Sequence, residues 1–150
     1  MIQAIDGRGL ITVQGPLPTG WNRIVGAAEP TFEGPAAGDG IAARLRVIVE
    51  PGTEGIETAS LGLMREIQLA RPGALVVNCE LWPHPQWGDG RYIQSAYLEG
   101  DVTLAHDIYL FVHAGRAIRV EVECALMQLL SIEESVATIV ARLRRREGAA

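Results

Sequence analysis

The stretch 81–90, which reads LWPHPQWGDG, holds the side chains best suited to a binding or metal site. Trp82 and Trp87 offer large, rigid contact areas, and tryptophan is a frequent anchor in protein interfaces. His84 lies between two prolines, and only Asp89 is near it as a second metal ligand, whereas zinc sites need three or four. We therefore predict no metal, an exposed His84, and either a binding loop or a loop that covers the end of the core.

Two further groups of residues could act as acids or bases. His106 and Asp107 are adjacent, so in a strand their side chains point to opposite faces and cannot pair. His106 falls on an apolar face and is expected to be a hydrogen-bonded core histidine. Glu121 and Glu123 share a face with Arg119, and this face points into water or into a polar groove, which predicts a solvated charge ladder. Because no nucleophile elbow or phosphate-binding glycine loop occurs, we expect no catalytic residues and no cofactor.

The composition is that of one ordinary globular domain over residues 1–150. The hydrophobic content is 48% and the charged content is 21%, which argues against disorder. The net charge of −5 makes nucleic acid a poor partner. All 13 basic residues are arginine, and together with the abundant alanine and glycine this indicates a bacterial source of high GC content.

The sequence suggests a protein of the cytoplasm. Its first residues lack a basic segment followed by an apolar run, and no apolar stretch reaches the roughly 18–20 residues that a membrane span needs. In a reducing compartment, Cys79 and Cys124 are expected to be buried small hydrophobic residues and not a disulfide.

The first half of the chain predicts three strands and a helix. Strands are expected at 9–13, 22–27 and 41–50, with a flexible loop over 34–40. Residues 56–70 then change period, because apolar residues recur at helical spacing: Ile56, Ala59, Leu63, Ile67 and Ala70.

The second half predicts an antiparallel sheet that ends in a helix. Strands at 74–82, 90–100, 101–113 and 118–125 follow one another through short turns, which only antiparallel neighbours allow. The third of these is apolar on much of both faces, as expected for a central strand that is covered twice.

The helix predicted at 131–146 closes the chain, and a frayed tail is expected at about 146–150. Ser131 and Glu134 have the spacing of a capping box, and the arginines collect at the C-terminal end, where the helix dipole favours cations. One apolar stripe runs along this helix: Ile132, Val136, Ile139, Val140 and Leu143.

This order of elements resembles the PsbP-like α/β/α sandwich superfamily, including the LpqN-like, DcrB and EagR-type bacterial proteins. The resemblance depends on the opening strand followed by GPLPTGW at 15–21, and on the final hairpin followed by an amphipathic helix. It implies an α+β fold with an antiparallel sheet flanked by helices. It also implies a non-catalytic module that binds a protein partner, as a chaperone or adaptor for a secreted or membrane-associated client.

Two alternative functions remain open. The chain could instead bind a small apolar ligand in a START-like interior cavity, or it could be a small enzyme of cone-shaped α+β fold if His106 or Asp107 faced a pocket. For any of these functions, the chain could also form a homodimer. For the binding module, we expect the contact surface to combine the loop 81–90 with an aromatic sheet face, and Trp87 to be exposed. The residues of this surface are Trp82, His84, Trp87, Tyr109 and Phe111.

Overall fold

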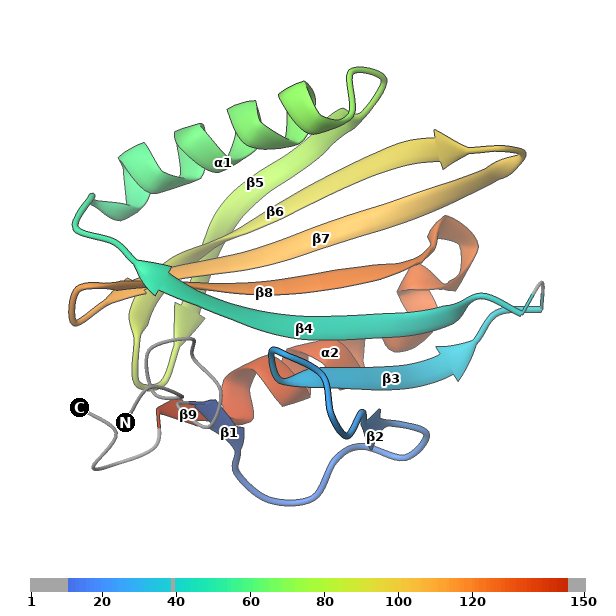
Figure 1. Ribbon diagram of the computed structural model, residues 1–150, viewed down its shortest axis with the longest axis horizontal. Coiled ribbons are helices and arrows are strands. Elements are labelled where there is room, and N and C mark those ends of the chain that lie inside the picture. The colour runs from blue at the N-terminus through green and yellow to red at the C-terminus, as the bar shows by residue number, and fades with distance from the viewer. Residues whose placement is uncertain (1–10, 39, 146–150) are drawn as a thin grey trace.

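The fold is a twisted antiparallel sheet with one helix on each face (Figure 1). The computed structural model describes residues 11–38 and 40–145, so the tail expected at about 146–150 and the first residues of the strand expected at 9–13 lie outside it. The seven strands of the sheet are hydrogen-bonded in the order β2-β3-β4-β8-β7-β6-β5, and a two-stranded sheet pairs β1 with β9. The predicted α+β class, an antiparallel sheet flanked by helices, is confirmed.

The strands follow the predicted segments closely in the second half of the chain. In chain order they are β1 (Ile11–Val13), β2 (Asn22–Arg23), β3 (Thr31–Ala36), β4 (Ala42–Pro51), β5 (Leu75–His84), β6 (Gly88–Glu99), β7 (Val102–His113), β8 (Arg116–Ala125) and β9 (Leu143–Arg145).

The first half of the chain departs from the prediction at two places. The strand expected at 22–27 is only two residues long, and residues 34–36 belong to β3 although 34–40 was expected to be a loop. Glycine and proline near 34 suggested the loop, but β3 lies near the edge of the sheet, where a missing N–H is tolerated. A register shift between Glu33 and Ala36 accommodates them.

Helix α1 (Ile56–Ala70) has the predicted boundaries. It begins after Gly55 and ends before Arg71, which precedes a proline and whose N–H still donates to the carbonyl of Ile67. Its buried side chains, Leu63 and Ile67, pack against the β6–β7 part of the sheet.

Helix α2 (Leu129–Arg142) starts and ends earlier than predicted. The predicted capping box is wrong, because Ser131 lies inside the first turn and its hydroxyl donates to the carbonyl of Gln128, over 2.7 Å. A 3₁₀ turn, η2 (Leu126–Gln128), precedes the helix. After Arg142 the chain becomes β9, so Arg144 and Arg145 pair with β1 and do not extend the helix.

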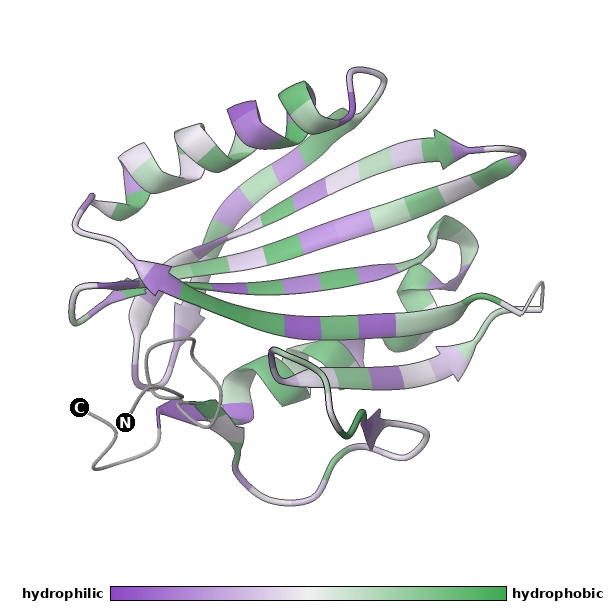
Figure 2. Cartoon of the chain, in the orientation of Figure 1, coloured by the Kyte–Doolittle hydropathy of each residue, from purple (hydrophilic) through white to green (hydrophobic). Residues whose placement is uncertain are grey.

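The sheet separates two hydrophobic cores, and β7 contributes to both. Along β4 and β8, hydrophilic and hydrophobic residues alternate (Figure 2). The apolar residues of these strands face α2, where Phe111, Ile118 and Ile139 are fully buried. This side is a packed core, which does not favour the START-like cavity. The central position predicted for the strand at 101–113 is confirmed.

The two cysteines differ in exposure and are both free thiols. Cys124 is buried in the α2-side core, as predicted, whereas Cys79 on β5 is exposed, contrary to the prediction. Cys79 is exposed because β5 is the last strand of the sheet. No helix in the described part of the chain is both long and apolar enough to cross a bilayer.

Candidate functional site

The predicted aromatic surface is folded into the core. Trp87 is only 5% exposed, so the expectation that it would be exposed is wrong. Its ring stacks on His84, with 4.1 Å between ring centroids and 9° between planes, and both rings contact Phe111. The predicted loop is in fact the end of β5 and the start of β6, joined by a short turn at 85–87. This β5–β6 loop covers the end of the α2-side core, which was the alternative interpretation of the stretch.

His84 is a buried hydrogen-bonding residue and not the exposed loop histidine that was expected. Its Nε2 lies 2.9 Å from the carbonyl oxygen of Val140 in α2, so this nitrogen carries the proton and donates. Its Nδ1 accepts from the backbone N–H groups of Gln86 and Trp87, at 3.1 and 3.2 Å. Neutral His84 thus joins the loop to the helix.

Burial lowers the pKa of His84, with Arg144 and His113 adding to the effect and the Val140 hydrogen bond opposing it. A proton on Nδ1 would also point at the backbone N–H groups of Gln86 and Trp87, which could then no longer donate to this nitrogen. The neutral ring therefore contributes stability that is fully present above the pKa of an unfolded histidine, about 6.5, and is lost as the pH falls below it.

We expect this loss to appear in the free energy of unfolding between about pH 7.5 and 5.5. Asp107 titrates in the same pH range with the opposite effect, so it is first replaced by asparagine. Its pKa is raised to about 6, so the stability that its protonated form contributes is present at low pH and is lost as the pH rises. In an Asp107→Asn background, urea titrations should show that the free energy of unfolding decreases as the pH is lowered. Adding His84→Gln should flatten this dependence of stability on pH. An unchanged slope in the double variant would contradict the role of His84.

The other predicted contact residues also lie on the α2 side. Tyr109 is buried, and Trp82 is partly buried against it, with 5.1 Å between ring centroids. Asp107 is buried on the same face, where the Tyr92 hydroxyl donates to its Oδ2 over 2.5 Å. Burial, only partly offset by this hydrogen bond, raises the Asp107 pKa to about 6. The five predicted contact residues do lie close together, but they form part of the core and not an exposed surface. Their role in binding stays a prediction.

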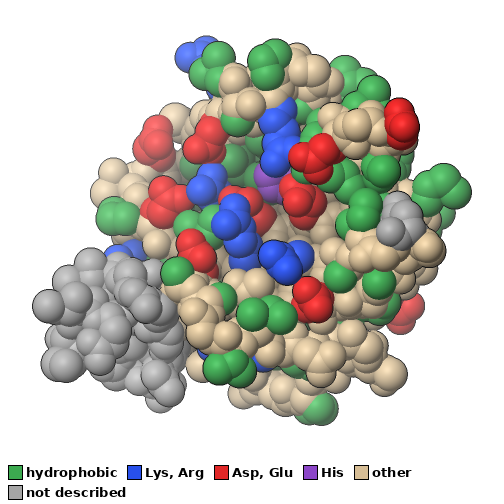
Figure 3. All heavy atoms as spheres, turned by 45° about the vertical axis from the view of Figure 1, so that its right-hand side comes forward, with side chains coloured by type: hydrophobic (Ala, Val, Ile, Leu, Met, Phe, Trp, Pro, Cys, Tyr) green, Lys and Arg blue, Asp and Glu red, His purple; other side chains and the backbone are tan. Residues whose placement is uncertain are grey.

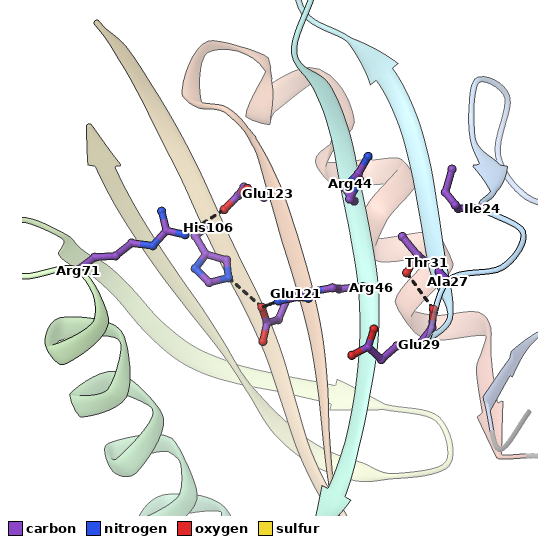
Figure 4. A pocket seen from close by; sticks show the side chains of 10 residues that line it. All are labelled: Ile24, Ala27, Glu29, Thr31, Arg44, Arg46, Arg71, His106, Glu121 and Glu123. Atoms are coloured by element: carbon purple, nitrogen blue, oxygen red, sulfur yellow. Dashed lines mark hydrogen bonds and ion pairs between the residues drawn. The ribbon is translucent and has the colours of Figure 1, made fainter. Parts of the chain in front are cut away.

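The opposite face of the sheet carries a charged cleft that the sequence did not single out. Helix α1 packs on β5, β6 and β7 and leaves the β3, β4 and β8 part of this face open. A cleft of about 430 Å³ lies there (Figure 4), and the space-filling view shows basic and acidic side chains gathered around a histidine (Figure 3). It is lined by Ile24, Ala27, Glu29, Thr31, Arg44, Arg46, Arg71, His106, Glu121 and Glu123.

Strand register explains why these charges meet. Arg46 is paired with Glu121 across β4 and β8, and Arg44 with Glu123. His106 on β7 is in turn opposite Glu123. Since directly opposed residues in an antiparallel sheet share a face, the polar positions of three strands form one surface.

Glu121 is the centre of the charge network. Its Oε1 lies 3.2 Å from Nη2 of Arg46 and 3.2 Å from Nε2 of His106, and its Oε2 lies 3.6 Å from Nε of Arg119. Burial by itself would raise the pKa of Glu121, but the hydrogen bond from His106 and the nearby positive charges lower it to about 2. Glu121 is therefore ionised at neutral pH, and His106 must donate to it.

A second cluster closes the cleft on the side of α1. The guanidinium of Arg71 lies 3.7 Å above the ring centroid of Tyr97, and its Nη2 is 3.7 Å from Oε2 of Glu123. The Tyr97 hydroxyl donates to the same Oε2 over 2.6 Å. Burial and the hydrogen bond to Glu123 raise the pKa of Tyr97 to about 12, so its hydroxyl remains a donor at neutral pH.

These positions test the sequence-based interpretation of the charged residues. His106 is hydrogen-bonded, as expected, but it lines a cleft instead of an apolar core; Asp107 lies on the other face, as predicted. The predicted ladder of Arg119, Glu121 and Glu123 exists, yet Glu121 is largely buried within it. Arg44 and Arg46 were missed, although the alternation of 41–50 places them on one face.

The cleft can bind through charge and hydrogen bonds. Its lining includes one hydroxyl, that of Thr31, which donates to the Glu29 carbonyl, and neither a serine nor a cysteine. Within the described residues, no group of three His, Cys, Asp or Glu side chains is placed to hold a metal ion. Arginine guanidiniums provide several donors each, so those already paired still have N–H groups for a ligand.

Comparisons with known proteins identify the fold. No family model matches the sequence, and no curated protein is similar to it. Among solved structures, LpqN of Mycobacterium tuberculosis, described as involved in cell envelope biogenesis, is similar over 90% of this chain and 83% of its own, with a TM-score of 0.64 and 11% identity. Cyanobacterial PsbP (CyanoP) of Synechocystis sp. PCC 6803 is similar over 93% and 95%, with a TM-score of 0.60 and 14% identity. The predicted PsbP-like fold is confirmed.

Proposed function

We propose that this chain of PsbP-like fold is a non-catalytic protein-binding module of the cytoplasm, a chaperone or adaptor for a secreted or membrane-associated client. The observation that carries the proposal is the charged cleft. Its arginines stay available, because the side chains of Arg44, Arg46 and Arg71 are 61%, 47% and 40% exposed although each is paired with a glutamate.

The balance of charges in the cleft favours a protein surface over a small ion. Three arginines and three glutamates line it, so neither a simple anion nor a simple cation is strongly attracted. Interleaved charges of both signs instead set register and exclude wrong partners at protein interfaces. Cell envelope involvement is stated for LpqN, and a client outside the cytoplasm would be consistent with it.

We expect an Arg44→Ala/Arg46→Ala variant to lose a client that the unchanged chain captures from its native host. Removing Arg46 leaves Glu121 with His106 and Arg119, so the fold should survive. Tagged chains would be purified from extracts and the bound proteins quantified by mass spectrometry, with a loss of about tenfold or more expected.

The matched control is Arg65→Ala, which removes an exposed arginine from the outer side of α1. Binding that is lost in the cleft variant and kept in the control supports the proposal, provided that circular dichroism shows both to be folded. A client that binds all three chains equally would contradict a role for the cleft.

A small enzyme remains the second candidate because His106 does face the cleft. An ionised carboxylate that accepts from one imidazole nitrogen, as Glu121 does, is the arrangement that orients a general base. Neither a serine nor a cysteine accompanies it among the described residues of the lining, and the Thr31 hydroxyl donates to the Glu29 carbonyl, so the base would act on water or on a substrate proton. Any turnover found should then disappear in His106→Gln.

A further inference from the structure

The two edges of the seven-stranded sheet differ in how they are protected. At one edge, β2 is only two residues long, both exposed and polar, and the adjoining β3 contains Pro35. The carbonyl of Pro35 already accepts from Gln128 over 2.7 Å. Short strands, prolines and covered polar groups are the usual devices that prevent edge-to-edge pairing.

The other edge, β5, has fewer of these devices, although a register shift between Val76 and Asn78 interrupts its pairing with β6 at Val77. It is ten residues long, and no strand in the described part of the chain pairs with its outer side. Exposed apolar residues occur along its length: Leu75, Val77 and Leu81 are 69%, 63% and 55% exposed, and Cys79 is exposed between the last two. Between 75 and 82 the only charge is Glu80, and proline appears only at 83. Such an edge is suited to strand addition.

We propose that the partner of β5 is β5 of a second copy of this chain, paired antiparallel about a twofold axis at Cys79. This register is chemically self-complementary. It places Val77 opposite Leu81 of the other copy, and Asn78 opposite Glu80, so an apolar pair and an amide–carboxylate pair each form twice. A register centred on Glu80 would oppose two carboxylates and is disfavoured.

The dimer joins two sheets into one and keeps the charged cleft free. Cleft residues lie on β3, β4, β8 and β7, and none of them lies on β5, the last strand of the order. Dimerisation through β5 and client binding in the cleft can therefore be tested separately, because substitutions on β5 leave the cleft residues unchanged and substitutions in the cleft leave β5 unchanged.

Native Cys79 supplies the first test. Directly opposed residues in an antiparallel pair have Cβ atoms about 4.5–5.5 Å apart, close to the spacing that a disulfide can bridge. Copper–phenanthroline and oxygen should take two electrons from two Cys79 thiols, releasing two protons and leaving one intermolecular disulfide. Cys124 is buried and serves as an internal negative. Peptide mass spectrometry should find Cys79 linked to Cys79, and Cys79→Ser should stay uncrosslinked.

The second test separates a specific dimer from chance collisions. A Val77→Lys/Leu81→Lys variant keeps Cys79 but places charges in both apolar pairs, so sedimentation velocity should show self-association weakened by about tenfold or more, with a parallel fall in crosslinking. Met127→Lys is the control, because that residue is 96% exposed and lies in η2, away from β5. An unchanged chain that is monomeric up to high concentration, or a variant that dimerises as well as the control, would overturn the proposal.

Discussion

Replacing Trp87 with alanine is expected to lower the free energy of unfolding by about 3–5 kcal/mol, the range for buried aromatic residues. The indole is 5% exposed and lies between His84 and Phe111, so its removal leaves a cavity at the end of the core. It also removes the ring on which His84 stacks, and His84 is the residue that joins the loop to Val140 of α2. Urea titration at pH 7.5 measures the loss.

The control for this prediction is Gln86→Ala in the same loop. The Gln86 side chain is exposed, and its backbone N–H can still donate to His84, so a change within about 0.5 kcal/mol is expected. If Trp87→Ala instead cost less than about 1 kcal/mol and abolished partner binding, the loop would be a contact surface and its burial would not be the stable state.

Replacing Ile139 with alanine is the second large effect, and we expect it to cost about 2–5 kcal/mol. Ile139 is fully buried in the core between α2 and the sheet, so truncating it to alanine leaves a cavity. Leu130→Ala is the matched control in the same helix, because Leu130 is mostly exposed and should change stability by well under 1 kcal/mol. Equal losses at both positions would mean that α2 is not docked as described.

Local pattern was enough to predict most elements of this fold. Period-two alternation between 90 and 125 predicted β6, β7 and β8, and apolar residues at helical spacing predicted α1 with its exact ends. The ends of α2 could not be predicted in this way. Ser131 and Glu134 have capping-box spacing, but capping depends on which backbone N–H groups are unpaired, and η2 had already begun the helical turn. Likewise, Arg144 joins a strand because β1 is there to pair with it.

The candidate site was only partly accessible to sequence reasoning. Alternation placed Arg119, Glu121 and Glu123 on one polar face, and the structure keeps them there. It could not reveal that Arg46 pairs with Glu121, 75 residues away in the sequence, or that α1 leaves the β3, β4 and β8 part of this face uncovered. Arg71 could not be recognised as a cleft residue from the sequence, because its context marks only the end of a helix. Its partners, Tyr97 and Glu123, lie on two strands that are distant in the sequence.

The sequence by itself determined the class of fold, the central position of β7 and the division of each strand into a polar and an apolar face, because these depend on the spacing of residues within a segment. Only the tertiary structure decided which faces are covered. Polar neighbours suggested an exposed Trp87, yet the loop folds back because His84 finds an acceptor on α2. His106 looked like a core residue, yet it lines a cleft, because α1 packs on β5, β6 and β7 and leaves the β3, β4 and β8 part of that face open. Burial depends on contacts between segments far apart in the chain, and no local pattern records them.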